Sequence, residues 1–163
     1  MLNKGNDGKG DNIERDLWQT EQGFWDKLNS QYNFQFDCCS SASNRKTENY
    51  SDNFRLVKTV DKAWMNPPFS KAKEMFEHFF KVVKSGVAIY RIDNPETKIW
   101  QEVIFPNADW VFIPCGRVSY TPSGITIRGG MTRFPSALIG LNVENPKGLI
   151  GTILKLKKGA SNA

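Results

Sequence analysis

The sequence predicts an α/β fold whose sheet is partly parallel, with antiparallel strands toward its C-terminal edge. Three observations lead to this prediction. Short apolar runs alternate with helical patterns early in the chain, one strand–helix–strand unit is well marked, and hairpin signals gather late in the chain. Strands that alternate with helices form parallel sheets, whereas strands joined by hairpins are antiparallel.

The first elements follow a polar start. Residues 1–12 are rich in Gly, Asn and Lys and are expected to be a disordered tip. A helix is predicted to run to about Asn29, with Thr20 as its N-cap, because apolar residues lie on one helical face: Leu17, Trp18, Phe24, Trp25 and Leu28. Residues 34–39 (FQFDCC) then indicate a short strand that enters the core. The polar residues 40–53 are predicted to form a loop with a short helix as an alternative.

A strand–helix–strand unit occupies the middle of the chain. Residues 63–65 (AWM) predict a strand that stops at Pro67. Residues 71–84 predict an amphipathic helix, because apolar residues recur at helical spacing: Ala72, Met75, Phe76, Phe79, Phe80 and Val83. Residues 87–92 form a second buried strand after Gly86, so the two strands are expected to be parallel neighbours.

The remaining elements are a helix and several strands. Residues 96–105 predict a helix with Pro95 in its first turn. Strand candidates follow at Trp110–Pro114, Val118–Thr121, Ile125–Arg128, Ser136–Val143 and, as a last edge strand, Ile150–Leu156, with a hairpin turn at Ser123-Gly124. Residues 13–156 are therefore expected to form a single domain, followed by a basic tail at 157–163.

Composition narrows the class of protein. The 163 residues carry a net charge of +5, a basic bias that suits an anionic partner. Three cysteines without a CxxC spacing and one histidine predict neither a disulfide framework nor a metal site. Because the chain has no apolar stretch of membrane-spanning length, we expect a soluble, cytoplasmic protein without a membrane partner.

The tetrapeptide Asn66-Pro67-Pro68-Phe69 follows the first strand of the central unit and carries the most distinctive chemistry. Two consecutive prolines fix two φ angles and remove two backbone donors, which leaves carbonyl oxygens as acceptors on a rigid loop. The Asn66 side-chain oxygen and the Pro67 carbonyl could then accept the two N–H bonds of a planar amino group. Phe69 could stack on the attached ring, a contact worth about 1–3 kcal/mol. An ordinary strand-terminating turn is the alternative interpretation.

Other candidate residues lie at strand ends or beside glycines. Asp37 and Asn66 both follow buried strands and are expected on one rim, where ligands of such sheets bind. Asp37 would accept hydrogen bonds from a ligand there or, as the alternative, cap the following turn. Arg128 and Arg133 flank Gly129-Gly130, which is either a basic loop that follows a phosphate backbone or a hairpin tip.

Four blocks, taken together in order and spacing, resemble the phage-type DNA N6-adenine methyltransferases, a Dam-like family of short single-domain enzymes. The blocks are residues 16–20 (DLWQT), 34–40 (FQFDCCS), 64–70 (WMNPPFS), and 116–120 (GRVSY) with 134–137 (FPSA). The likeness implies a Rossmann-like methyltransferase fold with S-adenosylmethionine as methyl donor and adenine in DNA as acceptor. The chain would then be a site-specific, adenine-specific DNA methyltransferase that flips its target base out of the stack. Its place would be the cytoplasm, that of the host cell if a phage encodes it.

The resemblance also implies roles for particular residues. The catalytic loop would be Asn66, Pro67, Pro68 and Phe69, with Asn66 also bordering the cofactor. Asp37 would border the cofactor, and Trp18 with Thr20 would help to close that pocket. Arg117 would lie near the nucleic acid, together with Arg128 and Arg133. The sequence does not indicate an oligomeric state.

Departures from the family pattern support a second hypothesis. Thr20-Glu21 stands where the family usually has Thr-Pro, and residues 91–95 (RIDNP) stand where relatives have a strand ending in Pro-Ala-Arg. The loop ends in Phe69 in place of the commoner Tyr, which keeps a ring for stacking. The alternative function is therefore a catalytically degenerate methyltransferase-fold protein that binds nucleic acid or a protein partner.

Overall fold

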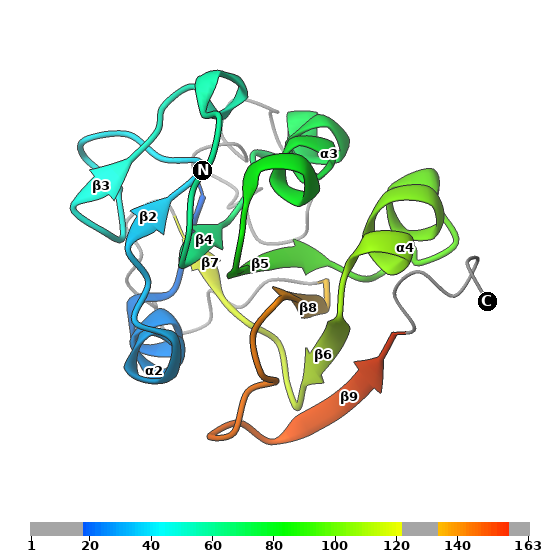
Figure 1. Ribbon diagram of the computed structural model, residues 1–163. Coiled ribbons are helices and arrows are strands. Elements are labelled where there is room, and N and C mark those ends of the chain that lie inside the picture. The colour runs from blue at the N-terminus through cyan, green and yellow to red at the C-terminus, as the bar shows by residue number, and fades with distance from the viewer. Residues whose placement is uncertain (1–17, 122–133, 157–163) are drawn as a thin grey trace, which may run out of the picture.

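The computed structural model describes residues 18–121 and 134–156, and within them seven strands form one mixed sheet (Figure 1). Four neighbouring strands are parallel: β3 (Asn49–Tyr50), β2 (Phe36–Asp37), β4 (Ala63–Met65) and β5 (Gly86–Arg91). Three further strands follow in the sheet: β8 (Ser136–Leu141), β6 (Trp110–Pro114) and β9 (Gly151–Lys155). Strand β8 pairs antiparallel with β5, β6 with β8, and β9 with β6. The prediction of a mixed α/β sheet with antiparallel C-terminal strands is confirmed.

Helices cover both faces of this sheet. Helix α2 (Gln22–Tyr32) lies on one side, and α3 (Ala72–Val82) lies on the other with a π-helical segment Ile99–Ile104 and α4 (Phe105–Asn107) (Figure 1). The strands alternate accordingly: Ala63 and Met65 pack in the cluster that contains α3, whereas Trp64 packs in the cluster that contains α2. Both clusters are fully buried at their centres, so the sheet forms a rigid middle layer.

The start of the described chain differs from the prediction. Thr20 was predicted to cap the first helix, but it belongs to β1 (Gln19–Thr20), which pairs antiparallel with β7 (Tyr120–Thr121). Glu21 is the N-cap instead, because its two carboxylate oxygens accept the N–H groups of Gly23 and Phe24 at 2.8 and 2.9 Å. The helix prediction itself is confirmed, with an end at Tyr32.

Other boundaries were shifted or missed. Strand β3 lies inside the segment predicted to be a loop, and the strand expected over 34–39 is limited to Phe36–Asp37. The helix expected over 96–105 is π-helical over Ile99–Ile104 and continues as α4 to Asn107, with Pro106 in the first turn of α4, where a missing N–H is tolerated. The predicted strand at Ile125–Arg128 and the turn at Ser123-Gly124 lie outside the described residues, as do the N-terminal tip and the basic tail.

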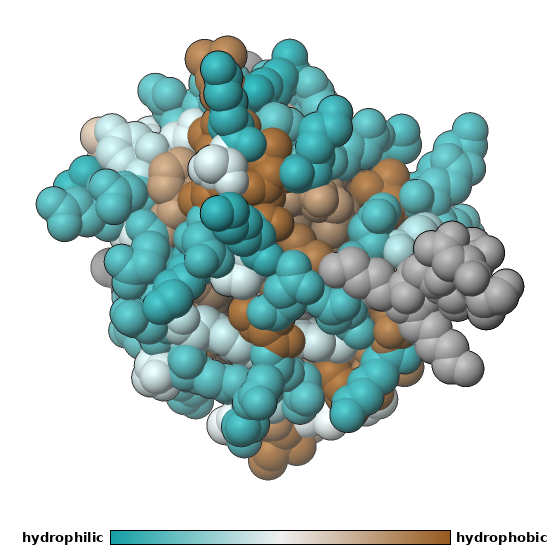
Figure 2. All heavy atoms as spheres, in the orientation of Figure 1, coloured by the Kyte–Doolittle hydropathy of each residue, from teal (hydrophilic) through white to brown (hydrophobic). Residues whose placement is uncertain are grey.

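The surface seen in the orientation of Figure 1 is mainly hydrophilic, with hydrophobic side chains visible between the polar ones (Figure 2). Large hydrophobic side chains that are exposed include Leu56, Ile150 and Leu154. In the described part of the chain, no helix combines the length and the apolar character needed to cross a lipid bilayer.

Candidate active site

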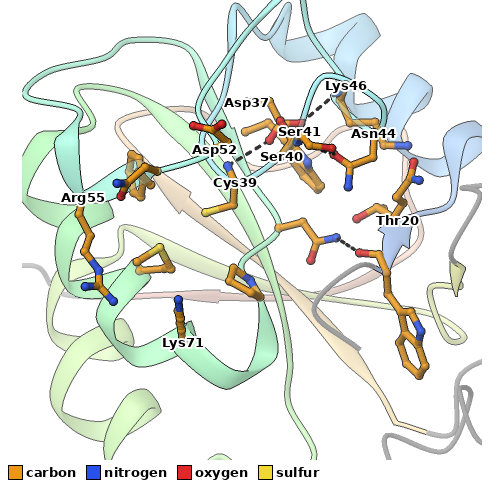
Figure 3. Close-up of a pocket in the computed structure, with 18 residues that line it drawn as sticks. Thr20, Asp37, Cys39, Ser40, Ser41, Asn44, Lys46, Asp52, Arg55 and Lys71 are labelled. Atoms are coloured by element: carbon orange, nitrogen blue, oxygen red, sulfur yellow. Dashed lines mark hydrogen bonds between the residues drawn. The ribbon is translucent and has the colours of Figure 1, made fainter. Parts of the chain in front are cut away.

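A pocket of about 520 Å³ opens at the carboxyl ends of the parallel strands (Figure 3). Asp37 ends β2, Asn66 follows β4, and Asp52 lies two residues beyond β3; all three line this pocket. The volume falls within the range of about 300–1,000 Å³ found for small-molecule and cofactor sites. The expectation that Asp37 and Asn66 share one rim is confirmed.

Asn66 is oriented by the main chain of a distant segment. Its Nδ2 donates a hydrogen bond to the carbonyl oxygen of Trp18 at 3.2 Å. Because the amide nitrogen is used in this way, the side-chain oxygen Oδ1 remains an acceptor for a ligand. Pro68 also lines the pocket, whereas Pro67 is buried and lies outside its lining.

Trp18 and Thr20, which precede α2 in the chain, form one wall of the pocket. Trp18 is 6% exposed, and its indole packs edge-on against Phe69 with the ring centroids 6.1 Å apart. Thr20 is fully buried, and its hydroxyl has no hydrogen-bond partner within the described residues. A buried hydroxyl without a partner costs about 1–3 kcal/mol, so this wall offers a group that a ligand could satisfy.

Asp37 organises the loop on the opposite side of the pocket. Its Oδ2 accepts the Lys46 N–H at 2.9 Å and its Oδ1 accepts the Cys39 N–H at 3.3 Å (Figure 3). The carboxyl is 2% exposed, and burial raises its pKa, while these backbone donors and Ser40 act in the opposite direction. The turn-capping role left open by the sequence is therefore present, and contact with a ligand stays a prediction.

Several pocket residues were not identified from the sequence. They come from the segment predicted to be a loop and from the helices that follow: Ser41, Asn44, Lys46, Asp52, Arg55 and Lys71. Asp52 was detectable in principle, since it follows a strand as Asp37 does, but β3 has only two residues and shows no periodicity.

The charged residues of the pocket differ in their surroundings. Lys46 donates from Nζ to Oε1 of Gln22 at 2.8 Å, and burial lowers its pKa, opposed most by Asp37. Arg55 pairs with Glu74 at 2.5 Å, and it lies with Lys71 on the side of the pocket facing α3 (Figure 3). The pocket therefore presents both cations and carboxylates to a ligand.

Phe69, the last residue of the Asn66–Phe69 loop, is not among the residues that line the pocket. It is half-buried among four rings, whose centroids lie 5.6 to 6.4 Å from its own: Trp18, Tyr90, Tyr120 and Phe134. We call these five residues the Phe69 cluster. The loop thus lies between the pocket, which Asn66 lines, and a largely buried aromatic cluster that contains Phe69.

Of the three predicted nucleic-acid contacts, Arg117 is the one that lies within the described residues. Arg117 is exposed and lines a second depression of about 320 Å³, together with Lys27 and Cys115. Arg128 and Arg133 lie outside the described residues. Across residues 18–121 and 134–156, no group of three or more His, Cys, Asp or Glu side chains could hold a metal ion.

Two comparisons with known proteins bear on the identity of the chain. The family model described as DNA N-6-adenine-methyltransferase (Dam) matches residues 8–154, which include every element described above except the last residue of β9. A search of curated proteins found no match.

Proposed function

The chain belongs to the DNA N-6-adenine-methyltransferase (Dam) family, and from this membership we propose that it transfers a methyl group from S-adenosylmethionine to N6 of adenine in DNA. The observation that carries the proposal is the position of Asn66. It lies at the carboxyl end of a central parallel strand, between the pocket and the Phe69 cluster. Four parallel strands with helices on both faces also support a Rossmann-like methyltransferase fold.

The chemistry of the pocket suits S-adenosylmethionine, which combines a base, a ribose diol and an amino-acid zwitterion. The carboxylates of Asp37 and Asp52 are suited to its hydroxyl and ammonium groups, and the unpartnered hydroxyl of Thr20 offers a further hydrogen bond. The apolar parts of S-adenosylmethionine match the apolar side chains that line the pocket: Trp18, Phe54, Trp64, Pro68 and Met75. When bound, this cofactor supplies an electrophilic methyl group on a positively charged sulfur.

Asn66 and Pro67 would make the amino group of adenine, which accepts the methyl group, a better nucleophile. The lone pair of an exocyclic amino group is delocalised into the base, so the nitrogen is a weak nucleophile. Acceptance of its two N–H bonds by Asn66 Oδ1 and the Pro67 carbonyl favours a pyramidal nitrogen, whose lone pair is then available. Held in this way by Asn66 and Pro67, the amino nitrogen would act as the nucleophile toward the methyl group, and it would lose one proton to water after the transfer.

The target adenine must leave the DNA stack to reach this loop. Flipping a base costs a few kcal/mol, and stacking on an aromatic ring returns about 1–3 kcal/mol. Phe69 follows Asn66 by three residues on the same loop and is only partly buried, so we assign the stacking contact to it. The net positive charge of the chain favours approach to the phosphate backbone.

The proposal is tested by incubation with isotope-labelled S-adenosylmethionine and DNA of mixed sequence, followed by mass spectrometry of the nucleosides. We expect labelled N6-methyladenine and no labelled N4-methylcytosine. Calorimetric titration with S-adenosylmethionine and its demethylated product accompanies the assay. Donor binding without methyl transfer to any adenine-containing DNA would refute the proposed activity and favour the degenerate alternative.

A further inference from the structure

The Phe69 cluster is bordered by a cation that is held in a fixed place. Arg91, the last residue of β5, donates two hydrogen bonds to Asp93, from Nε to Oδ1 at 2.8 Å and from Nη2 to Oδ2 at 2.5 Å. The two side chains are 22% and 29% exposed. A two-point pair between partly buried groups fixes the plane of the guanidinium as well as its position.

The guanidinium of Arg91 lies over aromatic rings of the cluster. Its Cζ is 4.4 Å from the ring centroid of Phe134 and 5.9 Å from that of Phe69. A cation over a ring face is attracted by the negative charge density of that face. Both distances lie within the range of about 6 Å for cation–π contacts, and the contact with Phe134 is the closer one.

Phe134 contacts both the Arg91 guanidinium and the ring of Phe69, so it links their positions. Phe134 is 2% exposed, and its ring meets that of Phe69 at an interplanar angle of 83° with 5.6 Å between the centroids. This edge-to-face arrangement is favoured for aromatic pairs. A continuous series of contacts therefore links Asp93, Arg91, Phe134 and Phe69.

The backbone around this pair is also fixed. Arg91 lies opposite Ser136 in the antiparallel pairing of β5 with β8, and the N–H of Ile92 donates to the carbonyl oxygen of Pro135 at 2.9 Å. The hydrogen bond from Arg91 lowers the pKa of Asp93, so the anchor is ionised at neutral pH. The guanidinium thus has little freedom to leave the rings.

We propose that Arg91 is a positioning residue for Phe69, which acts through Phe134 and is anchored by Asp93. The role in catalysis rests on the proposed function, in which the target base stacks on Phe69. A ring whose orientation is set before the base arrives loses less conformational entropy on binding. Removal of the cation should therefore weaken the capture of DNA and leave the donor pocket intact.

The first test needs neither donor nor DNA. Protein labelled with 13C in its phenylalanine rings is studied by NMR, with the signals of Phe69 and Phe134 assigned from leucine variants at each position. Arg91→Met removes the charge and keeps an unbranched apolar chain, and we expect both ring signals to shift and broaden. Arg91→Lys, which keeps the charge and loses the two-point pair, should have an intermediate effect. Unchanged signals in Arg91→Met would overturn the proposal.

The matched control is Lys73→Met, which removes a cation paired with Glu77 at 2.8 Å on the exposed side of α3. It should leave both phenylalanine signals unchanged. A change of the same size in this variant would show that the ring signals report a general loss of charge, and the proposal would be wrong.

The second test measures methyl transfer and donor binding. For Arg91→Met we expect the KM for DNA to rise about three- to tenfold, with the Kd for S-adenosylmethionine unchanged. Partial recovery of KM in Arg91→Lys would agree with positioning. A loss of thermal stability that weakens donor and DNA binding together would instead assign Arg91 a general structural role. If the wild-type protein methylates no DNA, the proposed function fails, while the NMR test still decides whether Arg91 positions Phe69.

Discussion

Asn66 Nδ2 and the carbonyl oxygen of Trp18 are joined by a 3.2 Å hydrogen bond that links the end of β4 to the residue before β1. This bond selects one of the two orientations that an amide side chain can adopt. It leaves Oδ1 as the acceptor beside the pocket, which is the atom that the proposed reaction requires. The wall that carries Thr20 and the Asn66–Phe69 loop are thus connected directly.

Replacement of Asn66 should affect the rate of methyl transfer but not the binding of S-adenosylmethionine. Asn66→Ala should lower kcat for methyl transfer by about 10²–10³-fold, because one of the two acceptors for the amino group is lost. The Kd for S-adenosylmethionine should change little. Asn66→Asp serves as the comparison: it keeps an acceptor but cannot donate to Trp18, so its rate should lie between those of the wild type and the alanine variant. Single-turnover assays and calorimetry measure both quantities, and normal turnover in Asn66→Ala would disprove the assignment.

Thr20→Val should lower the affinity for S-adenosylmethionine without lowering the stability of the fold. Because the Thr20 hydroxyl is buried without a partner among the described residues, its replacement by a methyl group should leave the free energy of unfolding unchanged or slightly higher. Donor affinity should fall about three- to tenfold, the value of one hydrogen bond. Thr20→Ser is the control that retains the hydroxyl. Unaltered donor affinity in Thr20→Val would remove Thr20 from the proposed cofactor site.

The pH dependence of stability reports on Asp37. Burial raises the pKa of this carboxyl in the folded state, so the folded protein binds the proton more tightly than the unfolded chain. The contribution of Asp37 to stability is therefore greatest below its ordinary pKa of about 3.9 and is lost as the pH rises through the raised value. Asp37→Asn cannot titrate. The free energy of unfolding of the wild type minus that of Asp37→Asn should decrease from about pH 4 to pH 8, as measured by urea titration. An increase would mean that the backbone donors outweigh burial.

Gly140 and Gly148 provide a matched test of packing. A Cβ at Gly140 would lie 1.9 Å from Cε2 of Trp110, the residue opposite it in the pairing of β6 with β8. The indole is held there by a 2.7 Å hydrogen bond from Nε1 to the carbonyl oxygen of Val143, so it cannot move aside easily. Gly140→Ala should lower the free energy of unfolding by about 1–3 kcal/mol or more. Gly148→Ala, where nothing lies within 4 Å of the added Cβ, should have a small effect in the same urea titration.

Arg117 can be tested through the salt dependence of DNA binding. If its side chain contacts one phosphate, Arg117→Gln should reduce the slope of log K against log salt concentration by about 0.9. Fluorescence anisotropy with labelled duplex DNA gives the slope. Lys147→Gln is the control, because Lys147 is an exposed cation paired with Glu144. Equal slopes for the wild type and Arg117→Gln would place Arg117 outside the DNA contact.

Elements with a clear apolar pattern could be predicted from the sequence, and these include the short strand β4, whose predicted bounds 63–65 are those of the structure. The amphipathic pattern around Phe76 and Phe79 identified α3, and β6 has the predicted bounds Trp110–Pro114. By contrast, β1 and β3 were not predicted as strands, because each has two residues, which is too few to show a period. Their existence depends on partners far away in the chain, such as Tyr120 for Thr20.

The candidate site was predictable where a residue follows a recognisable strand. Asp37 and Asn66 were placed on one rim for this reason, and both line the pocket. Lys46 was missed because its place depends on a contact of its N–H with the Asp37 carboxylate nine positions away, and Asp52 was missed because β3, which precedes it, is too short to show a period. The Arg91–Phe134 contact depends on the pairing of β5 with β8, which no local pattern encodes.

The pairing of β1 with β7 has a consequence for the order in which the protein is assembled. Domains fold as the ribosome releases them from the N-terminal end onward. Residues Trp18 to Glu21 emerge early, but their hydrogen-bonding partners in Ser119–Thr121 emerge only after the parallel strands have been made. A nascent chain that ends before Ser119 would carry the rim with Asp37 and Asn66 without a fixed wall opposite them. The wall of the proposed donor site can therefore form its strand pairing only after Ser119–Thr121 have been synthesised.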